Sequence, residues 1–364
     1  MKTTLINHAR IGESVRIEGF LEHIRNTRYM AFLVVRDRSG SVQATIEKQL
    51  HPEWTEILDS LTVESVVSIE GNLRENPQVK LGGCELIPAK LEILSLAAPL
   101  PLTKDANIDT RMDYRWLDLR GEKERLLFEV QTCLVSAMRE FLLQREFIEI
   151  HTPKLIAAAS ESGADVFEVG YFDRKAYLAQ SPQFYKQMAM AAGFERIFET
   201  GPVFRAEKSY TNRHTTEFTG FDLEFSYIES FHDVMNLEAE LLTYALERVQ
   251  QQFGEKIERL YGTKVIVPKL PFPVIALPEL YRELEKRYGY HLPESERGDT
   301  TTEAEQLSYR FSKEEFGHEF LLITDFAAEK RAFYHMRKDG VPQGYDLVWR
   351  GVEITTGAQR EHRY

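Results

Sequence analysis

One stretch near the middle of the chain, GPVFRAEKSYTNRHTTEFTGFDLEF at Gly201–Phe225, collects residue types that could bind a nucleotide. Two apolar segments that alternate like strands flank a charged loop too long for a tight turn, which predicts a hairpin. Arg205 stands at the end of the first strand, and Phe218 and Asp222 stand on the second. A guanidinium fork binds phosphate, a flat ring stacks on a base, and a cationic loop neutralises a leaving group. We therefore expect a polyphosphate site here; the alternative is a solvated loop with surface ion pairs.

Regular elements on both sides must hold this hairpin in place. Apolar residues recur at helical spacing over Glu122–Phe147 and again over 232–256, which predicts two long amphipathic helices. A series of strands begins at FIEIHTPKL, and the helix SPQFYKQMAMAAG lies among these strands. The strands FLLITDF, AFYHMRK and YDLVWRGVEITT follow the second long helix. This mixture predicts an α+β domain.

The first hundred residues have a different pattern. Five strand-like segments between residues 14 and 97 are broken by the turns RSGS and ENPQ, and one helix, about Glu53–Leu61, interrupts them. This order is that of an OB-type barrel, which commonly binds single-stranded nucleic acid; the alternative is a small barrel with another task. We expect domains at 1–100 and 125–364, joined by a Pro-rich and polar hinge at 101–124.

Composition limits the class of protein. A chain of 364 residues with 43% apolar content can bury a substantial core and fits two domains. No apolar run approaches the roughly 20 residues of a membrane span, and no apolar signal core is present, so we expect a cytoplasmic protein without a membrane partner. The net charge of −12 argues against binding nucleic acid through overall charge. Cys84 and Cys133 lack CxxC spacing, and we interpret both as packed thiols.

Several motifs resemble those of the class II aminoacyl-tRNA synthetases. The hairpin stretch is similar to motif 2 of that family, and FIEIHTPKL is similar to motif 1, with its proline at Pro153. The runs LAQSPQFYKQMAMAAGFERIFETGPVFRAE, MDYRWLDLR and GVEITTGAQREHRY look like the aspartyl enzymes of the archaeal and eukaryotic type, also found in some bacteria. The resemblance covers nearly the whole chain. It implies an OB-fold anticodon-binding domain, then a catalytic domain built on an antiparallel sheet flanked by helices.

The resemblance implies that the hairpin binds ATP. Arg205, the expected catalytic residue, would bind the α-phosphate together with the carboxylate of the amino acid and so bring the reacting groups together. Phe218 would stack on adenine, and Glu207 would contact the adenine amino group or hold the loop. Arg213 and His214 would address the β- and γ-phosphates from the loop.

A metal site is also implied by the resemblance. Asp346 and Glu353 would hold Mg²⁺ against the phosphates of ATP, so Glu353 also counts as an ATP residue. Carboxylates suit this hard ion, which keeps most of its waters. Without the resemblance, we would interpret both as strand carboxylates near a surface.

The amino-acid pocket is implied by the resemblance and supported by charge. Lys186 and Arg360 stand where the family holds the side-chain carboxylate of L-aspartate, a group that needs permanent positive charge when it leaves water. Asp222 would orient Lys186, Glu161 would take the substrate ammonium, and Gln183 would lie beside it. These cations disfavour a lysine-specific or an asparagine-specific relative. Taken alone, Lys186 would be interpreted as a solvated lysine.

The barrel residues Arg25, Phe32 and Gln43 align with positions that meet anticodon bases in the aspartyl enzymes. Stacking on Phe32 and hydrogen bonds from Gln43 suit splayed single-stranded bases. The alternation of MAFLVV equally permits Phe32 in the barrel core. Glu22 and Lys80 give conflicting indications on whether tRNA(Asn) is charged as well as tRNA(Asp).

Two features depart from the family pattern. The glycine-rich motif 3 is expected some tens of residues beyond Tyr364 and does not occur in the sequence. We interpret this as truncation rather than as a degraded paralog, and we expect weak or absent activation of aspartate by the 364-residue chain. In addition, ESG at Glu161–Gly163 replaces the usual EGG of the closing loop.

The expected function is that of an aspartate–tRNA ligase, with ATP and Mg²⁺ as cofactors and tRNA and L-aspartate as partners. The alternatives are an asparaginyl-tRNA synthetase, a catalytically weak tRNA-binding paralog, and an asparagine-forming paralog, which typically lacks the barrel. The helix at Glu122–Phe147 and the strand at Pro153 imply a homodimer, as motif 1 does in this class.

Overall fold

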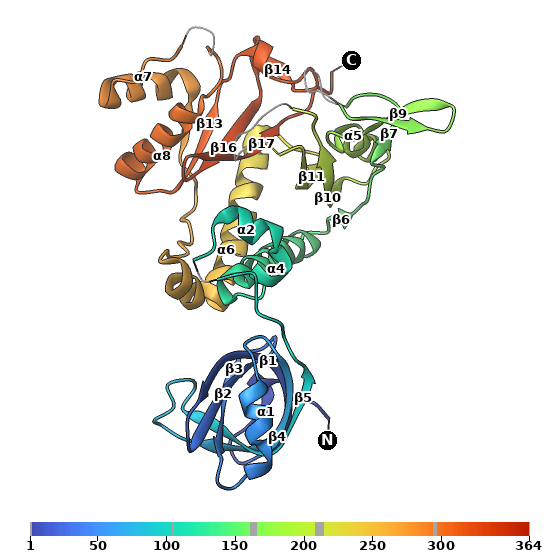
Figure 1. Ribbon diagram of the computed structural model, residues 1–364. Coiled ribbons are helices and arrows are strands. Elements are labelled where there is room, and N and C mark those ends of the chain that lie inside the picture. Colours follow the sequence, from blue (N-terminus) through green and yellow to red (C-terminus); the bar gives the residue numbers. More distant parts are fainter. Residues whose placement is uncertain (1, 104, 161–165, 208–214, 294–296, 364) are drawn as a thin grey trace. The chain divides into compact units, whose positions relative to one another are not determined.

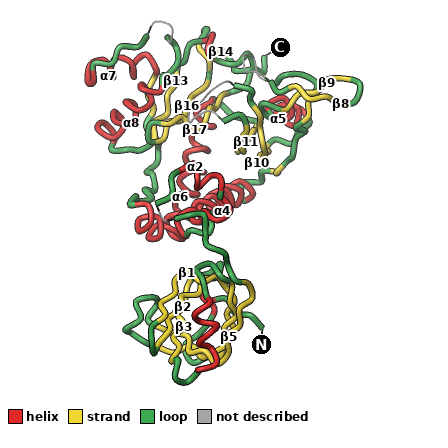
Figure 2. Tube along the Cα trace, viewed as in Figure 1, coloured by secondary structure: helices red, strands yellow, loops and turns green. Residues whose placement is uncertain are grey.

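The computed structural model describes residues 2–103, 105–160, 166–207, 215–293 and 297–363. The chain divides into two compact units, Met1–Gly121 and Glu122–Tyr364 (Figure 1). Strands dominate the first unit, whereas helices and strands alternate along the second (Figure 2). Among the described residues, no helix combines the length and the apolar run that crossing a bilayer requires.

The first unit contains a closed five-stranded barrel with the strand order β1-β2-β3-β5-β4. Its strands are β1 (Ser14–Asn26), β2 (Met30–Arg36), β3 (Ser41–Glu47), β4 (Val66–Glu75) and β5 (Cys84–Ser95). Helix α1 (Thr55–Ser60) lies between β3 and β4. The predicted barrel, with its helix after the third strand, is therefore confirmed.

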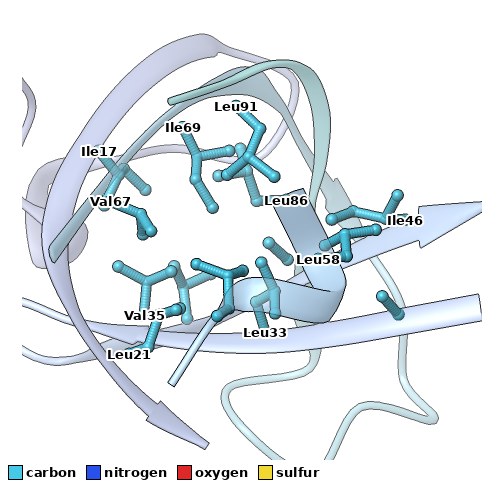
Figure 3. Close-up of a cluster of buried hydrophobic side chains, with 14 of the residues drawn as sticks. Ile17, Leu21, Leu33, Val35, Ile46, Leu58, Val67, Ile69, Leu86 and Leu91 are labelled. Atoms are coloured by element: carbon cyan, nitrogen blue, oxygen red, sulfur yellow. The ribbon is translucent and has the colours of Figure 1, made fainter. Parts of the chain in front are cut away.

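Alternation along the strands builds the core of the barrel. Every second residue of β2 and β3 is buried, which directs one set of side chains inward. Ile17, Leu33 and Ile69 meet there, and Leu58 brings α1 onto the same core (Figure 3). The curvature requires glycine at position 19, because a Cβ atom there would collide with the backbone carbonyl of Arg36.

The segment expected to be a hinge carries two short helices, α2 (Ile108–Asp113) and α3 (Arg115–Asp118). One turn of the barrel holds both ends of this segment. The Thr62 hydroxyl donates to the carbonyl of Ala97 at 2.7 Å, and the Arg120 guanidinium donates to Glu64 at 2.9 Å. The described residues on either side of the two short helices are thus attached to the barrel.

In the second unit, helices α4 (Glu122–Leu143) and α6 (Phe231–Tyr261) pack against each other (Figure 1). The prediction extended the first of these helices to Phe147. Instead α4 ends at Leu143, and the chain turns at Glu146, whose φ is 63°. Helix α6 begins at a capping box formed by Ser230 and Asp233 and ends at Gly262, whose φ is 67°.

The strands of the second unit form two main sheets, with orders β11-β10-β6 and β12-β13-β16-β17. Their bounds are β6 (Ile148–Glu149), β10 (Arg196–Phe204), β11 (Glu217–Phe225), β12 (Val274–Ala276), β13 (Phe320–Thr324), β16 (Gly344–Trp349) and β17 (Val352–Ala358). Antiparallel pairing dominates, as predicted, and only β6 and β12 add parallel edges among the described main-sheet strands. Both β11 and β17 lie at an edge of their sheets.

Smaller sheets and further helices complete the unit. The small sheets are formed by β7 (Leu155–Ile156), β8 (Glu168–Tyr171), β9 (Arg174–Leu178), β14 (Arg337–Lys338) and β15 (Val341–Pro342). The remaining helices are α5 (Gln183–Ala191), α7 (Leu277–Tyr288) and α8 (Thr302–Phe316).

Both faces of the larger sheet are covered. Leu322 and Leu347 lie in a core with α6, whereas Leu321, Ile323 and Val348 lie in a second core with α7 and α8. Successive residues of β13 and β16 therefore point to different helices. This double burial agrees with β13, whose residues are all buried.

Candidate active site

The predicted hairpin is confirmed as β10 and β11, paired from Arg196 opposite Phe225 to Phe204 opposite Glu217. On β11, Phe221, Leu223 and Phe225 pack against the core that α4 and α6 share. The intervening residues lie on the other face: Phe218, Gly220, Asp222 and Glu224. The predicted phosphate ligands Arg213 and His214 lie outside the described residues.

Arg205 and Phe218, predicted to bind ATP, lie next to each other. The guanidinium carbon of Arg205 is 5.4 Å from the centroid of the Phe218 ring, within the range of a cation–π contact. The Nε atom of Arg205 is buried and has no partner among the described residues, and Phe218 is 38% exposed. Both residues and Glu207 line a cavity of about 1870 Å³. An unpaired N–H and an exposed ring beside one cavity suit a phosphate and a base.

Lys186 and Arg360, the predicted aspartate-binding cations, belong to one ion-pair network. Lys186 Nζ donates to Asp222 Oδ1 at 2.9 Å and lies 3.5 Å from Glu224 Oε2. Arg360 Nε donates to Glu224 Oε1 at 2.9 Å, and its Nη2 donates to Gln183 Oε1 at 3.0 Å. Five side chains thus meet in this network, from α5 (Gln183 and Lys186), from β11 (Asp222 and Glu224) and from the residues after β17 (Arg360). Of these five, only Glu224 was not predicted.

Burial changes the interpretation of this network. Lys186 is only 3% exposed, so the interpretation as a solvated helix lysine is wrong. Burial opposes ionisation of Glu224, but Lys186 and Arg360 outweigh it, so the pKa of Glu224 is lowered. The network therefore holds its charges in pairs before any substrate enters.

Gln183 and Ser160 offer polar atoms that remain unused. The Gln183 Nε2 atom and the Ser160 hydroxyl are buried and have no partner among the described residues. A buried donor without a partner costs free energy that a ligand can recover. Glu161, the predicted ligand of the substrate ammonium, directly follows Ser160 and lies outside the described residues.

The predicted metal residues Asp346 and Glu353 lie on the adjacent strands β16 and β17. Asp346 is buried and accepts two hydrogen bonds from Arg331, at 2.8 and 2.6 Å. Glu353 lines the cavity, and its Oε1 accepts a hydrogen bond from the Thr356 hydroxyl at 2.8 Å. The two strands therefore bring the predicted pair together.

The electrostatics of Glu353 fit a bound cation. Although Glu353 as a whole residue is exposed, desolvation of its carboxyl group, followed by the nearby charges of Asp346 and Glu305, raises the pKa of Glu353 to about 7. A divalent cation at this carboxylate would relieve that repulsion. Asp346 fits less directly, because Arg331 already binds both of its oxygens. Among the residues that the structure describes, no cluster of three His, Cys, Asp or Glu side chains could hold a metal ion by itself.

The predicted anticodon residues lie together on the outer surface of the barrel. Arg25 pairs with Phe32 across β1 and β2, and its guanidinium carbon is 5.7 Å from the Phe32 ring centroid. Phe32 is half-buried between the core residues Ala31 and Leu33, so the alternative that placed it in the core is wrong. Gln43, on β3, is also half-buried, and its amide donates to the Thr45 hydroxyl at 3.2 Å.

Sequence reasoning missed several residues of the site. Glu224 continues the alternation of Phe218, Gly220 and Asp222 along β11, and this pattern could have found it. Arg331 and Glu305 gave no signal, because they reach Asp346 and Glu353 from distant segments of the chain.

Comparison with protein families identifies the class that these features define. Residues 107–364 match the family described as tRNA synthetases class II (D, K and N), and residues 15–94 match the OB-fold nucleic acid binding domain. The chain belongs to the class II tRNA synthetases. The predicted family and fold class are therefore confirmed.

Individual relatives show which members of the family the chain resembles. The chain is 42% identical to the aspartate–tRNA(Asp/Asn) ligase of Aeropyrum pernix, over 97% of this chain and 81% of that protein. It is 39% identical to the aspartate–tRNA(Asp) ligase of Pyrococcus abyssi, over 97% of this chain and 82% of the relative.

Solved structures agree on the fold. Asparaginyl-tRNA synthetase from Pyrococcus horikoshii, complexed with asparaginyl-adenylate, matches with a TM-score of 0.88 and 29% identity, over 99% of this chain and 84% of that one. Aspartyl-tRNA synthetase from Entamoeba histolytica matches with a TM-score of 0.85 and 29% identity, over 100% and 79%.

Proposed function

We propose that this chain is an aspartate–tRNA ligase, which activates L-aspartate with ATP and transfers it to the 3′ end of tRNA(Asp). The observation that carries the proposal is the partly buried network of Lys186, Asp222, Glu224 and Arg360 at the cavity that Arg205 and Phe218 also line. Relatives that match nearly the whole chain are named aspartate–tRNA ligases, and these names support the same substrate.

The proposed reaction has two steps. An oxygen of the α-carboxylate of aspartate attacks the α-phosphorus of ATP, and pyrophosphate leaves with the electron pair of the broken P–O bond. A ribose hydroxyl at the 3′ end of the tRNA then attacks the acyl carbon, and AMP leaves. Arg205 would contribute by binding the α-phosphate, where negative charge develops, and by aligning it with the carboxylate. Phe218 would hold the adenine ring.

The amino-acid pocket would select aspartate by its side-chain charge. Lys186 and Arg360 present only donors, so an aspartate carboxylate can accept hydrogen bonds from both. The amide nitrogen of asparagine would face those donors instead and would leave buried N–H groups unpaired. The Gln183 Nε2 atom, which has no partner in the part of the chain that the structure describes, lies beside the same site and would donate to the substrate as well.

Magnesium is proposed as the metal of the reaction. Glu353 would hold it, with Asp346 and the Thr356 hydroxyl nearby. When bound, Mg²⁺ neutralises charge on the phosphates. Glu353 must lose its proton before it can bind the ion, which ties metal binding to the raised pKa of this residue.

The barrel is proposed to recognise the anticodon. Phe32 offers a half-buried ring on the outer surface, and Arg25 and Gln43 supply N–H donors near it. Unpaired bases can stack on such a ring and form hydrogen bonds at their edges. The relatives include enzymes named for tRNA(Asp) and others named for tRNA(Asp/Asn), so tRNA(Asn) is a second candidate substrate.

A homodimer is proposed through the motif 1 region. Exposed apolar side chains collect on α4 and on the short strands after it: Leu127 and Phe128, Leu143, Ile148 and Leu155. Such a surface suits burial by a second copy. Because charged tRNA serves the ribosome, the compartment proposed for the chain is the cytoplasm.

Aminoacylation tests the proposal. tRNA transcripts with the Asp and the Asn anticodon are each offered aspartate and asparagine, and we expect aspartate, at a low rate, to be the amino acid transferred to the transcript with the Asp anticodon. Preferential transfer of asparagine would instead support an asparaginyl-tRNA synthetase. Tight binding of the transcript without adenylate formation or transfer would support a tRNA-binding paralog.

A further inference from the structure

A buried carboxyl group lies between α6 and the strands that carry the candidate metal pair. Glu238, on α6, is 7% exposed, and its neighbours on this face of the helix are the apolar residues Met235, Leu241 and Leu242. A carboxyl group in such surroundings is costly unless it forms hydrogen bonds. Burial raises the pKa of Glu238. The partners of this side chain therefore indicate what it is for.

Glu238 is hydrogen-bonded to one of the site strands and lies near the other. The Tyr345 hydroxyl on β16 donates to Glu238 Oε2 at 2.6 Å. The side chain of Thr355 on β17 lies near the same carboxyl group and lowers its pKa in part. Tyr345 directly precedes Asp346, and Thr355 directly precedes Thr356. One group on the helix thus holds β16 directly, beside β17.

Tyr345 transmits this anchor to β17 through a direct contact. It is paired with Gly357 across the two strands, and a Cβ atom at position 357 would collide with the tyrosine ring and its hydroxyl. The ring therefore rests on the backbone of Gly357, which explains why glycine stands there. Arg360 follows three residues later in the chain. The position of the Tyr345 ring against Gly357 therefore determines the path of the backbone that leads to Arg360.

The same strand links the anchor to the metal pair. Successive side chains of a strand point to opposite faces, so Tyr345 faces α6 while Asp346 faces Arg331 and the α8 side. A shift of Tyr345 would consequently move Asp346, Gly357 and Arg360 together. Misplacement of a binding group by about 1 Å can cost as much as two orders of magnitude in rate.

We propose that Glu238 is a positioning residue for the amino-acid pocket, acting through Tyr345 and Gly357 on Arg360. The substrate named in this inference rests on the proposed function, whereas the geometry rests on the Tyr345–Glu238 hydrogen bond and the packing of Tyr345 on Gly357. Glu238 itself contacts neither substrate in this account. It belongs to a different element from every pocket residue assigned above.

Substitutions of different length and polarity test the role. Glu238→Leu removes the hydrogen bond to Tyr345, and we expect the Kd for aspartate to rise about tenfold, while the Kd for ATP measured without Mg²⁺ changes less than about twofold. Glu238→Gln keeps an acceptor for Tyr345 at the same distance and should restore aspartate binding to within about twofold. Tyr345→Phe should weaken aspartate binding as Glu238→Leu does, and the double variant should be no weaker than either single variant.

A matched control separates positioning from general stability. Glu319 is a buried carboxylate at the other end of β16, where it accepts a hydrogen bond from Arg350 at 2.9 Å. Glu319→Leu also destroys a buried polar contact of this sheet and should lower the melting temperature, yet leave the Kd for aspartate unchanged. If Glu319→Leu weakened aspartate binding as much as Glu238→Leu, the positioning role would be refuted.

Hydrogen exchange provides a readout that does not depend on the substrate. We expect Glu238→Leu to speed amide exchange in residues 353–359, and Glu319→Leu to speed it mainly in residues 347–350. Unchanged exchange in residues 353–359 of Glu238→Leu would overturn the inference even if aspartate binds. If the wild-type chain binds aspartate no better than asparagine, the proposed function fails, while the exchange pattern still decides whether Glu238 holds the strand.

Discussion

Two cations and two carboxylates in one network give the candidate pocket its character. Lys186 and Arg360 are already paired with Asp222 and Glu224, so the empty pocket carries no large excess of charge. Such pairing offsets part of the free energy that desolvation of these charges costs. Net charge therefore attracts a substrate carboxylate only weakly. On the proposed function, we expect the fixed geometry of this network to determine selectivity.

The pKa of Glu353 leads to a prediction about pH and metal binding. Because its folded-state pKa of about 7 lies above the ordinary value of 4.5, protons compete with a cation at this carboxylate below pH 7. We expect Mg²⁺ to raise the melting temperature at pH 8 and to have little effect at pH 5.5. Glu353→Gln should abolish the effect at both pH values. The account of the metal site would be wrong if Mg²⁺ stabilised the Gln variant at pH 8 as it does the wild type.

The same raised pKa has a consequence for the metal-free protein. Protonated Glu353 is favoured in the folded state, so its contribution to stability is present below pH 4.5 and is lost as the pH rises through about 7. Glu353→Gln should therefore make the metal-free protein more stable at pH 8 and change little at pH 5. Urea unfolding at the two pH values measures this difference.

At the level of single residues, the sequence predicted only those pocket residues that lie within recognisable motifs. Lys186 and Arg360 came from a resemblance to known motifs, because a lysine in a short helix has no local feature that marks it as buried. Glu224 was accessible to reasoning from strand alternation. Arg331 was not, because its partner Asp346 is fixed by tertiary packing and not by spacing in the chain.

Strands β16 and β17 carry the predicted metal pair, and their close packing leads to a prediction for two glycines. Gly357→Ala places a Cβ atom against the Tyr345 ring, and we expect a loss of about 1–3 kcal/mol in unfolding free energy. Gly254→Ala, inside α6, meets its nearest atom at 3.5 Å and should instead stabilise by about 0.5–1 kcal/mol. Equal effects in urea unfolding would contradict the close packing of these two strands.

Element types were predictable where periodicity is strong. Helices α4 and α6 follow long amphipathic patterns, and the hairpin β10–β11 follows alternation on both sides of a charged loop. The strand predicted at AFYHMRK was too long, because only its last two residues form β14. The equally short strands β7 and β15 were not predicted, because pairs of two residues carry no period. The separation into two sheets was also not predicted, since strand order is decided by long-range pairing.

Two units with separate cores make up the whole molecule, and we expect them to respond separately to core substitutions. Leu33→Ala in the barrel should lower the stability of that unit by about 2–5 kcal/mol and leave aspartate binding unchanged. Leu284→Ala, fully buried in the second unit, is the matched control and should act on the other calorimetric transition. A single transition that shifts equally in both variants would show that the units do not unfold independently.

The central claim is that Lys186 binds the side-chain carboxylate of the substrate and so distinguishes aspartate from asparagine. Calorimetric titration tests this claim most directly. We expect the wild-type chain to bind aspartate about a hundredfold more tightly than asparagine, a difference of about 2.7 kcal/mol. Lys186→Met should remove most of this preference, whereas Lys175→Met, at a lysine whose side chain is 68% exposed, should retain it. A folded Lys186→Met variant with the wild-type preference would contradict the account.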